Sequence, residues 1–225
     1  MRLSVERRAV IERVARCIPA SEGEDCVRVA VDGVDGAGKT VFADELAAVV
    51  EASGRPVVRI SLDDFLNTRA VRYQRGRTSP EGFWADSYDY RRFESDVLAA
   101  FRPGGSRRYR SVAYDLGTDT VLEPEPHVAA PGTVLLVDGM FLHRDELSAT
   151  WDLSVFLDVP FAVTAGRMAV RDGSNPDPEH PSMRRYVEGQ RIYLRTCSPR
   201  QRATVLIDNR DVEVPRIIGD RRLTT

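Results

Sequence analysis

The chain has 225 residues, 42% of them hydrophobic, which is enough to bury a sizeable core in one domain over residues 1–225. Its 32 Lys and Arg residues are balanced by 34 Asp and Glu residues, so the formal charge of -2 excludes a global basic field for nucleic acid or an anionic bilayer. The sequence MRLSVERR is charged where a secretion signal needs an apolar core, and no later stretch is long enough to span a membrane. We therefore expect a cytoplasmic protein whose partners include neither nucleic acid nor a membrane.

The apolar pattern along the chain predicts alternating helices and strands. Val10, Val14 and Ile18 recur at helical spacing, which indicates an amphipathic helix over residues 4–18. The β-branched run VRVAV follows as a strand, then a glycine-rich turn and the helical pattern VFADELAAVVEA. Further apolar runs are expected to be strands at residues 57–61, 133–138, 153–159 and 204–208. Strands that are apolar along their whole length favour a three-layer α/β fold, in which helices flank a central parallel sheet of about five strands within a core over 27–210.

The interval from about residue 62 to 88 shows little periodicity, although it is rich in aromatic and basic side chains. Its aromatic residues include Phe65, Tyr73, Phe83 and Trp84, and its arginines are Arg69, Arg72, Arg75 and Arg77. Long loops of this kind in compact domains are usually lids or binding loops. We therefore expect this interval to be the substrate-binding loop.

Residues 33–40 read GVDGAGKT and match the pattern G-x-x-x-x-G-K-[ST] at every position. The glycines let consecutive backbone N–H groups turn toward one centre, which creates an anion site at the start of a helix. Lys39 is then placed to reach the β- and γ-phosphates of a nucleotide, and the Thr40 hydroxyl to bind Mg²⁺. The motif thus predicts ATP and Mg²⁺ as cofactors. The residues expected to bind the nucleotide are Gly33, Asp35, Gly36, Ala37, Gly38, Lys39, Thr40 and Val41.

A carboxylate that shares the metal with Thr40 is expected at the end of a neighbouring buried strand. The run TVLLVDGMF supplies Asp138 at this position. An Asp that closes a strand is also a common turn former, so the position alone does not separate the two interpretations. Because a P-loop motif accompanies it, we interpret Asp138 as the metal-binding carboxylate.

Two more carboxylates, Asp63 and Asp64, close the expected strand at 57–61 and reach the same edge of the sheet as the P-loop. Transfer of a phosphoryl group to a hydroxyl requires a carboxylate that orients the hydroxyl and accepts its proton. The pair therefore contains a candidate for this base. The alternative is that both residues simply cap the strand.

These motifs together resemble the family of uridine kinase, phosphoribulokinase and the bacterial pantothenate kinases. In chain order they read GVDGAGKT, DDF, YDYRRFESDVL, VAYD, LLVDGMFL, WDLSVFLDVP, GRMAVRD and SPRQRATVLIDN, and they span residues 27–210. The resemblance implies a P-loop kinase that moves the γ-phosphoryl group of ATP to a hydroxyl of a small molecule. It implies that Asp63 is the catalytic base and is counted with Thr40 and Asp138 among the metal-binding residues, and that Asp64 stands where relatives often carry another small or acidic residue.

The GRMAVRD motif carries Arg167 and Arg171, whose spacing of four puts both guanidinium groups on one face of an expected helix. Two such groups can stabilise the charge on a transferring phosphoryl group, and in the related kinases this segment is the lid. We therefore expect catalytic roles for both arginines beside Lys39, and a helical lid over about residues 167–185. The Gly- and Pro-rich run DGSNPDPEHPS can act as its hinge and exclude water from ATP. The alternative is a solvated arginine face.

The acceptor region departs from the uridine kinase pattern. Trp84 stands where relatives carry the Asp that holds the ribose diol, and the histidine expected after Tyr114 is replaced by GTD at 117–119. The aromatic side chains of Phe83, Trp84 and Tyr114 can stack on a flat ring, which favours a nucleoside or nucleoside-like acceptor. The alternative is that they belong to the core. The residues expected to bind the acceptor are Asp64, Phe65, Phe83, Trp84, Tyr114 and Asp115.

Two other functions stay open at this point. The arginines of the 62–88 interval suit an anionic acceptor such as pantothenate or a sugar phosphate. A P-loop NTPase or regulatory nucleotide-binding module without an acceptor is the second, and both Asp63 and the long aromatic interval disfavour it. Whether the chain forms a homo-oligomer is not determined by its sequence.

Overall fold

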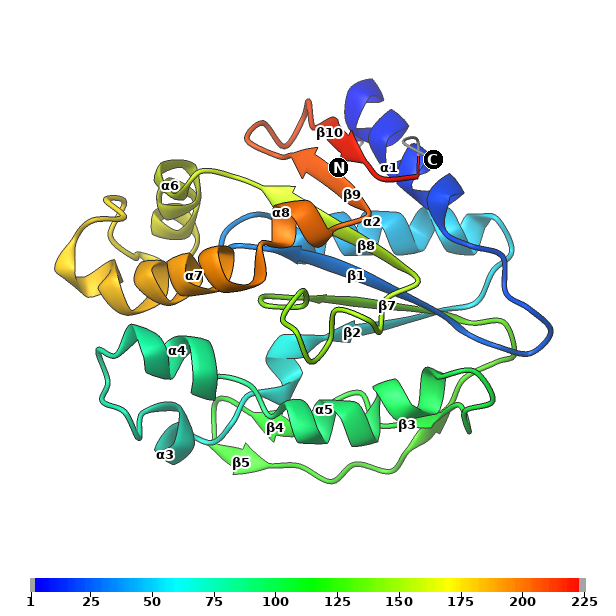
Figure 1. The fold of residues 1–225 in the computed structure, drawn as a ribbon, viewed down its shortest axis with the longest axis horizontal. Coiled ribbons are helices and arrows are strands. Elements are labelled where there is room, and N and C mark those ends of the chain that lie inside the picture. Colours follow the sequence, from blue (N-terminus) through cyan, green and yellow to red (C-terminus); the bar gives the residue numbers. More distant parts are fainter. Residues whose placement is uncertain (1–2, 223–225) are drawn as a thin grey trace.

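The structure, a computed structural model, describes residues 3–222, so residues 1, 2 and 223–225 of the expected domain lie outside it (Figure 1). Its strands are β1 (Val27–Gly33), β2 (Val57–Ser61), β3 (Arg108–Tyr109), β4 (Tyr114–Asp115), β5 (Thr120–Val121), β6 (His127–Val128), β7 (Val134–Gly139), β8 (Leu153–Asp158), β9 (Val205–Asp208) and β10 (Arg216–Asp220). Its α-helices are α1 (Val5–Cys17), α2 (Lys39–Ala52), α3 (Arg69–Arg72), α4 (Pro80–Asp86), α5 (Tyr90–Asp96), α6 (Phe161–Asp172), α7 (Arg184–Cys197) and α8 (Pro199–Arg202). Short 3-10 helices are η1 (Leu62–Phe65), η2 (Leu98–Phe101) and η3 (Pro181–Met183).

Six strands form the central sheet, in the order β10-β9-β8-β1-β7-β2. Neighbours pair in parallel except at the edge, where β10 runs antiparallel to β9. The parallel strands are those expected from the sequence. The sequence analysis missed β10 because the run RIIGD is short and carries only two apolar side chains, Ile217 and Ile218. In a parallel sheet the carboxyl ends of the strands share one edge, so the segments that follow β1, β2, β7, β8 and β9 meet there.

Helices cover both faces of this sheet and complete the three expected layers. On one face α1 and α2 pack over Val29 and Val31 of β1 and over alternate residues of β7, β8 and β9. On the other face η1, α4, α5 and α7 pack over Ala30 and over the remaining apolar residues of β2 and β7. Successive residues of a strand point to opposite faces, so Val31 and Asp32 belong to different layers of the core.

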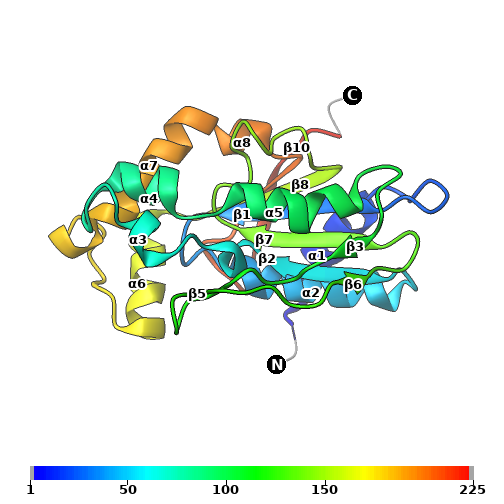
Figure 2. The same ribbon diagram turned by 90° about the horizontal axis from the view of Figure 1, so that it is seen from below.

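The helices α3, α4, α6 and α7 gather at one end of the molecule, beyond the carboxyl edge of the sheet (Figures 1 and 2). The 62–88 interval, expected as a loop, contains η1, α3 and α4. None of these exceeds seven residues, which is too short for a helical periodicity to be recognised. Local signals define α4, since the Ser79 side chain accepts the N–H of Gly82 and Pro80 occupies its first turn.

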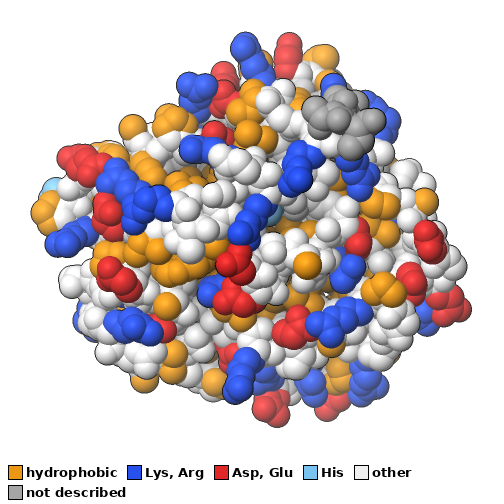
Figure 3. All heavy atoms as spheres, in the orientation of Figure 1, with side chains coloured by type: hydrophobic (Ala, Val, Ile, Leu, Met, Phe, Trp, Pro, Cys, Tyr) orange, Lys and Arg blue, Asp and Glu red, His pale blue; other side chains and the backbone are white. Residues whose placement is uncertain are grey.

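The surface mixes charges of both signs. Figure 3 shows basic and acidic side chains interspersed over the face in view, with apolar side chains between them. This distribution agrees with the formal charge of -2. Among the described residues, no helix combines the length and the apolar character needed to cross a membrane.

Candidate active site

The P-loop connects β1 to α2 at the carboxyl edge of the sheet. Gly36 and Gly38 have φ angles of 74° and 88°, a conformation that other residues rarely adopt. A Cβ on Gly36 would lie 2.8 Å from the carbonyl oxygen of Thr164, so the close approach of α6 also requires glycine there. The Lys39 ammonium donates to the carbonyl of Val34 at 3.0 Å. The strand, the glycine-rich turn and the helix expected around the motif are therefore all present.

Two amide side chains from outside the motif hold the P-loop. Asn209, fully buried after β9, donates through Nδ2 to the carbonyl of Ala37 at 2.8 Å. Gln190 of α7 accepts the backbone N–H of Asp35 at 2.7 Å. Neither residue was given a role from the sequence. Asn209 closes the SPRQRATVLIDN run, which carries no chemistry that marks its amide, and Gln190 is one polar residue on an amphipathic helix.

Thr40, in the first turn of α2, contacts Asp138 near the end of β7. The Thr40 hydroxyl donates to Asp138 Oδ2 at 2.7 Å, and the guanidinium of Arg59 donates to the other oxygen at 2.9 Å. Asp138 is buried. Within residues 3–222 no cluster of three or more His, Cys, Asp or Glu residues forms a protein-only cage. One hydroxyl and one carboxylate are still what Mg²⁺ needs when nucleotide phosphates and water complete its shell, so the donor set fits this ion.

A cavity of about 400 Å³ opens above these groups. From the residues expected to bind the nucleotide, its wall includes Asp35, Gly36, Gly38, Lys39, Thr40 and Val41. Gly33 and Ala37 lie beneath this surface as buried parts of the turn. Asp63, Asp138, Arg167 and Arg171 complete the predicted set around the same cavity. We refer to it as the P-loop cavity.

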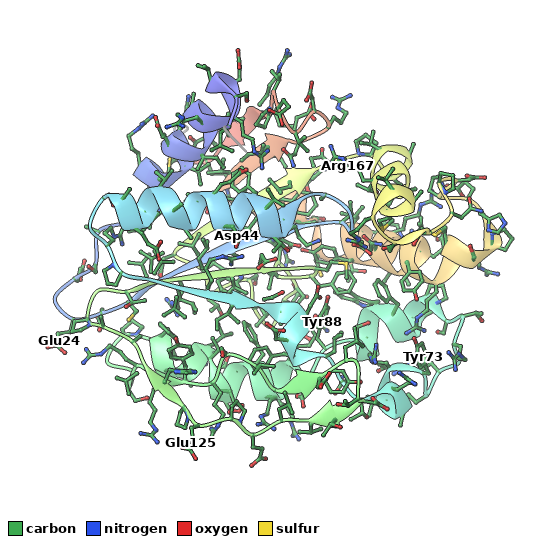
Figure 4. The ribbon with its side chains drawn as sticks, turned by 180° about the vertical axis from the view of Figure 1, so that it is seen from behind. Glu24, Asp44, Tyr73, Tyr88, Glu125 and Arg167 are labelled. Atoms are coloured by element: carbon green, nitrogen blue, oxygen red, sulfur yellow. The ribbon has the colours of Figure 1, made fainter. Side chains whose placement is uncertain are left out.

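Arg167 and Arg171 both project from α6 toward the P-loop, as the spacing of four predicts. Arg167 donates to the backbone carbonyls of Asn209 and Arg210 at 2.9 and 2.8 Å, and burial lowers the pKa of its guanidinium. Arg171 is exposed and pairs with Asp172 and, at 3.4 Å, with Asp35. Figure 4 shows Arg167 on the α6 side of the site and Tyr88 and Tyr73 on the side of α3 and α4.

Asp63 lies where the P-loop cavity meets a second cavity of about 600 Å³, and its carboxylate belongs to the walls of both. Tyr88 donates its hydroxyl to Asp63 Oδ1 at 2.7 Å. Burial, and then the neighbouring Asp63 charge, raise the pKa of Tyr88 well above its usual value, so the phenol stays a donor. The exposed carboxylate is therefore held in a defined direction between two spaces.

Asp64, the second residue of the pair, has a raised pKa. The main cause is the partial loss of water around its carboxyl group, followed by the charges of Asp63 and Asp138. Three carboxylates thus crowd the junction of the two cavities.

The second cavity, which we call the acceptor cavity, is lined by five aromatic side chains together with aliphatic and charged ones. Predicted residues in its wall are Asp64, Phe83, Tyr114 and Asp115. Tyr73, Tyr88 and Tyr186 add three more rings. Tyr114 and Asp115 reach the cavity from β4, which pairs with β5 in a small hairpin.

Phe65 and Trp84, also expected to bind the acceptor, lie outside this cavity. Phe65 is fully buried and packs edge-on against Phe93, with 5.2 Å between ring centroids. Trp84 is partly buried and packs edge-on against Phe141 and at a tilt against Tyr193, at the core beneath α7. Phe83 belongs to the same core and also packs against Phe141, but it contributes to the cavity wall, whereas Trp84 does not.

Two arginines also line the acceptor cavity. Arg72, one of the four arginines considered in the sequence, donates to the Tyr114 hydroxyl at 3.1 Å. Arg185 of α7 is buried and donates to the carbonyls of Gly76, Ser79 and Arg72 at 3.2, 3.0 and 2.8 Å. The sequence analysis did not single out Arg185, because one arginine among several on an amphipathic helix looks like its solvated neighbours.

The fold and the site together define a P-loop kinase, and comparison with known proteins gives its family. Residues 28–175 match the model of the phosphoribulokinase / uridine kinase family, so the chain belongs to that family. A solved protein described as a possible uridine kinase from Bacillus stearothermophilus is similar, with a TM-score of 0.71, 23% identity, and coverage of 90% of this chain and 99% of that one. The D-glycerate 3-kinase from Cryptococcus neoformans is similar with a TM-score of 0.54 and 15% identity, covering 81% of this chain and 84% of that one. No significant match was found among curated protein sequences.

The chain is therefore a small-molecule kinase, a phosphotransferase with a hydroxyl group as acceptor. The identity levels of the solved neighbours support the fold alone, so its particular acceptor has to be argued from the site.

Proposed function

We propose that the protein transfers the γ-phosphoryl group of ATP to a hydroxyl of a nucleoside or a nucleoside-like compound, as a uridine kinase-like enzyme. The observation that carries this proposal is the position of Asp63 in the shared wall of the P-loop cavity and the aromatic acceptor cavity. A base at that junction has the terminal phosphate on one side and the acceptor hydroxyl on the other.

On the nucleotide side, the P-loop amides and Lys39 bind the β- and γ-phosphates. Thr40 and Asp138 are the residues that would hold Mg²⁺, which neutralises phosphate charge when it is bound. Arg167 and Arg171 then stabilise the equatorial oxygens of the transferring group as the 167–185 lid closes and excludes water. Asp63 orients the acceptor hydroxyl and takes its proton.

The charges around the acceptor cavity favour an uncharged acceptor over an anionic one. Both guanidinium groups in its wall already bind protein atoms: Arg185 holds three backbone carbonyls and Arg72 holds Tyr114. The other charged groups there, Asp63, Asp64 and Asp115 among them, are carboxylates. A phosphate or carboxylate on the acceptor would meet these charges, whereas a flat neutral ring can stack between the aromatic side chains.

A kinase for pantothenate, a sugar phosphate or another small alcohol is the second candidate. It requires Arg72 to leave Tyr114 and turn toward an anion. A nucleotide-binding module without an acceptor is the third, and a 600 Å³ cavity that opens onto the carboxylate beside the P-loop disfavours it.

A panel screen with γ-labelled ATP and Mg²⁺ separates the three candidates. The panel contains nucleosides, pantothenate, and neutral and phosphorylated sugars, and the readout is label in the acceptor. We expect acceptor-dependent transfer to a ring-bearing neutral alcohol, which disappears in Asp63→Asn. Transfer only to anionic acceptors would favour the second candidate. ADP release that no acceptor stimulates would favour the third.

A further inference from the structure

Asp32 is an ionisable residue at a core position of β1, the strand that leads into the P-loop. Its side chain has no exposed surface, and it points to the face of the sheet that carries Ala30 and the apolar layer beneath α4, α5 and α7. A buried carboxylate is unfavourable there unless its oxygens accept hydrogen bonds. The GxxxxGK[ST] pattern begins one residue later and places no demand on this position.

Asp32 accepts hydrogen bonds at both of its oxygens. Oδ1 accepts the backbone N–H of Gly33 at 2.7 Å. Oδ2 accepts from His143 Nδ1 at 2.7 Å, from the His143 backbone N–H at 3.2 Å, and from the hydroxyl of Tyr193. With the imidazole proton on Nδ1, a carboxylate at this position accepts every one of these hydrogen bonds. The charge is thus satisfied by donors that arrive from fixed directions.

The donors come from the elements that build the nucleotide site. Gly33 is the first residue of the P-loop. His143 is five residues beyond Asp138, in the segment that follows β7, and it is buried like Asp32. Its position therefore depends on the same strand that carries the metal-binding carboxylate.

The third donor comes from α7, which reaches the P-loop at two points. Tyr193 meets Asp32, and Gln190, one turn earlier on the same helix, accepts the N–H of Asp35. Tyr193 is 1% exposed, and its ring packs against Phe141 at 5.0 Å between centroids. The helix is thereby fixed both to the start and to the middle of the phosphate-binding turn.

We propose that Asp32 is a positioning residue for the P-loop, and that His143 and Tyr193 hold its carboxylate in the orientation that fixes the Gly33 amide. Through this contact the network sets where the following amides point when they meet the nucleotide phosphates. Both oxygens of the buried Asp32 carboxylate are paired, although the far ring nitrogen of His143, Nε2, has no partner among the described residues. A buried carboxylate held from several directions is rigid, and small displacements of binding groups are costly in recognition. The inference rests on the nucleotide-binding part of the proposed function and is independent of the acceptor.

The test measures binding of a non-hydrolysable ATP analogue with Mg²⁺ by calorimetry, so that no acceptor is needed. Tyr193→Phe removes one donor to Asp32, together with the oxygen that accepts the His143 backbone N–H at 3.1 Å, and keeps the aromatic ring. Tyr90→Phe is the matched control: its hydroxyl is also buried, but its polar neighbour is Arg144 and it makes no hydrogen bond to Asp32 or the P-loop, and its ring lies beside Tyr88 in the same core. We expect affinity to fall about 3- to 10-fold in Tyr193→Phe and to change by less than about twofold in Tyr90→Phe.

Asp32→Asn is the stronger variant, because its amide turns a donor toward groups that also donate. We expect a loss of about tenfold or more in analogue affinity, and if this variant does not fold, Tyr193→Phe decides. Thermal unfolding is measured in parallel, since a merely structural role lowers Tm without changing the affinity of the folded protein. Wild-type affinity in Tyr193→Phe overturns the inference whatever its Tm. A wild-type protein that does not bind the analogue overturns the proposed function, and the inference with it.

Discussion

The P-loop cavity and the acceptor cavity share Asp35 and Asp63, yet they are built in different ways. Most of the P-loop cavity comes from one run of residues, 35–41, which presents backbone amides. The acceptor cavity is assembled from η1, α3, α4, the β4–β5 hairpin and α7, and it presents side chains. Backbone amides serve any nucleotide, whereas a side-chain wall can change with the acceptor while the fold persists.

This contrast predicts that substitutions fall into separate classes. Changes on the P-loop side should alter nucleotide binding, changes on the acceptor side should alter the KM of the acceptor, and changes to Asp63 should alter turnover alone. A substitution that changes a property assigned to the other cavity would contradict this separation.

The largest effect is expected for Lys39→Ala, which removes the cation that neutralises the β- and γ-phosphates. Transfer should fall below detection and analogue binding should weaken. Lys39 is also the only lysine in the sequence, so an amine-acylating reagent read by mass spectrometry reports on this side chain and the chain terminus alone. MgATP should protect Lys39 and leave the terminal amine reactive. Equal labelling with and without MgATP would contradict a phosphate contact.

Asp63→Asn should lower kcat by about 10²- to 10⁴-fold while the affinity for the ATP analogue stays within about twofold. The amide cannot accept the hydroxyl proton but fills the same space. Steady-state kinetics and calorimetry on one preparation make the comparison. Near-normal turnover would show that Asp63 is not the base. A loss of affinity for the ATP analogue would show that Asp63 also contributes to nucleotide binding.

Arg185→Lys should raise the KM of the acceptor about tenfold with little change in the KM of ATP. Lysine keeps the charge but loses the planar fork that holds the carbonyls of Gly76, Ser79 and Arg72. Its neighbour Arg184 is exposed, so Arg184→Lys is the matched control and should leave both constants unchanged. An equal rise in the KM of ATP would indicate that α7 transmits the change to the P-loop.

The smallest effect concerns stability. The pKa of Asp64 is raised in the folded protein. In the metal-free protein the free energy of unfolding therefore begins to fall as pH rises past the ordinary Asp pKa, and the loss is complete above the raised pKa. Asp64→Asn should therefore raise Tm at neutral pH, and the difference should vanish as pH falls below the ordinary value. Thermal scans across that range, without Mg²⁺, measure this. A difference that is constant with pH would exclude the electrostatic cause.

Local patterns were sufficient for the parallel strands, the P-loop and the carboxylates at strand ends. Each of these depends on a short contiguous run, and a parallel sheet brings such runs to one edge. The strand β10 and the helices α3 and α4 were missed because each is too short to show a period.

The side of the core that a residue faces could not be predicted in the same way. Phe83 and Trp84 are adjacent aromatics with the same sequence preference, and only the packing of α4 against α7 places one of them in the cavity wall as well as in the core. Arg185 and Gln190 likewise have contacts far away in the chain. Their roles arise from tertiary structure, which a single sequence without repeats or motifs at those positions does not reveal.

The central claim is that Asp63 lies between the terminal phosphate and the acceptor hydroxyl. It is tested most directly by a crystal structure with the ATP analogue, Mg²⁺ and the acceptor found in the screen. We predict that an oxygen of Asp63 lies within hydrogen-bond distance, about 2.6 to 3.2 Å, of the acceptor hydroxyl, and that this hydroxyl faces the γ-phosphate. An acceptor bound elsewhere, with the Asp63 carboxylate turned to solvent, would contradict the account.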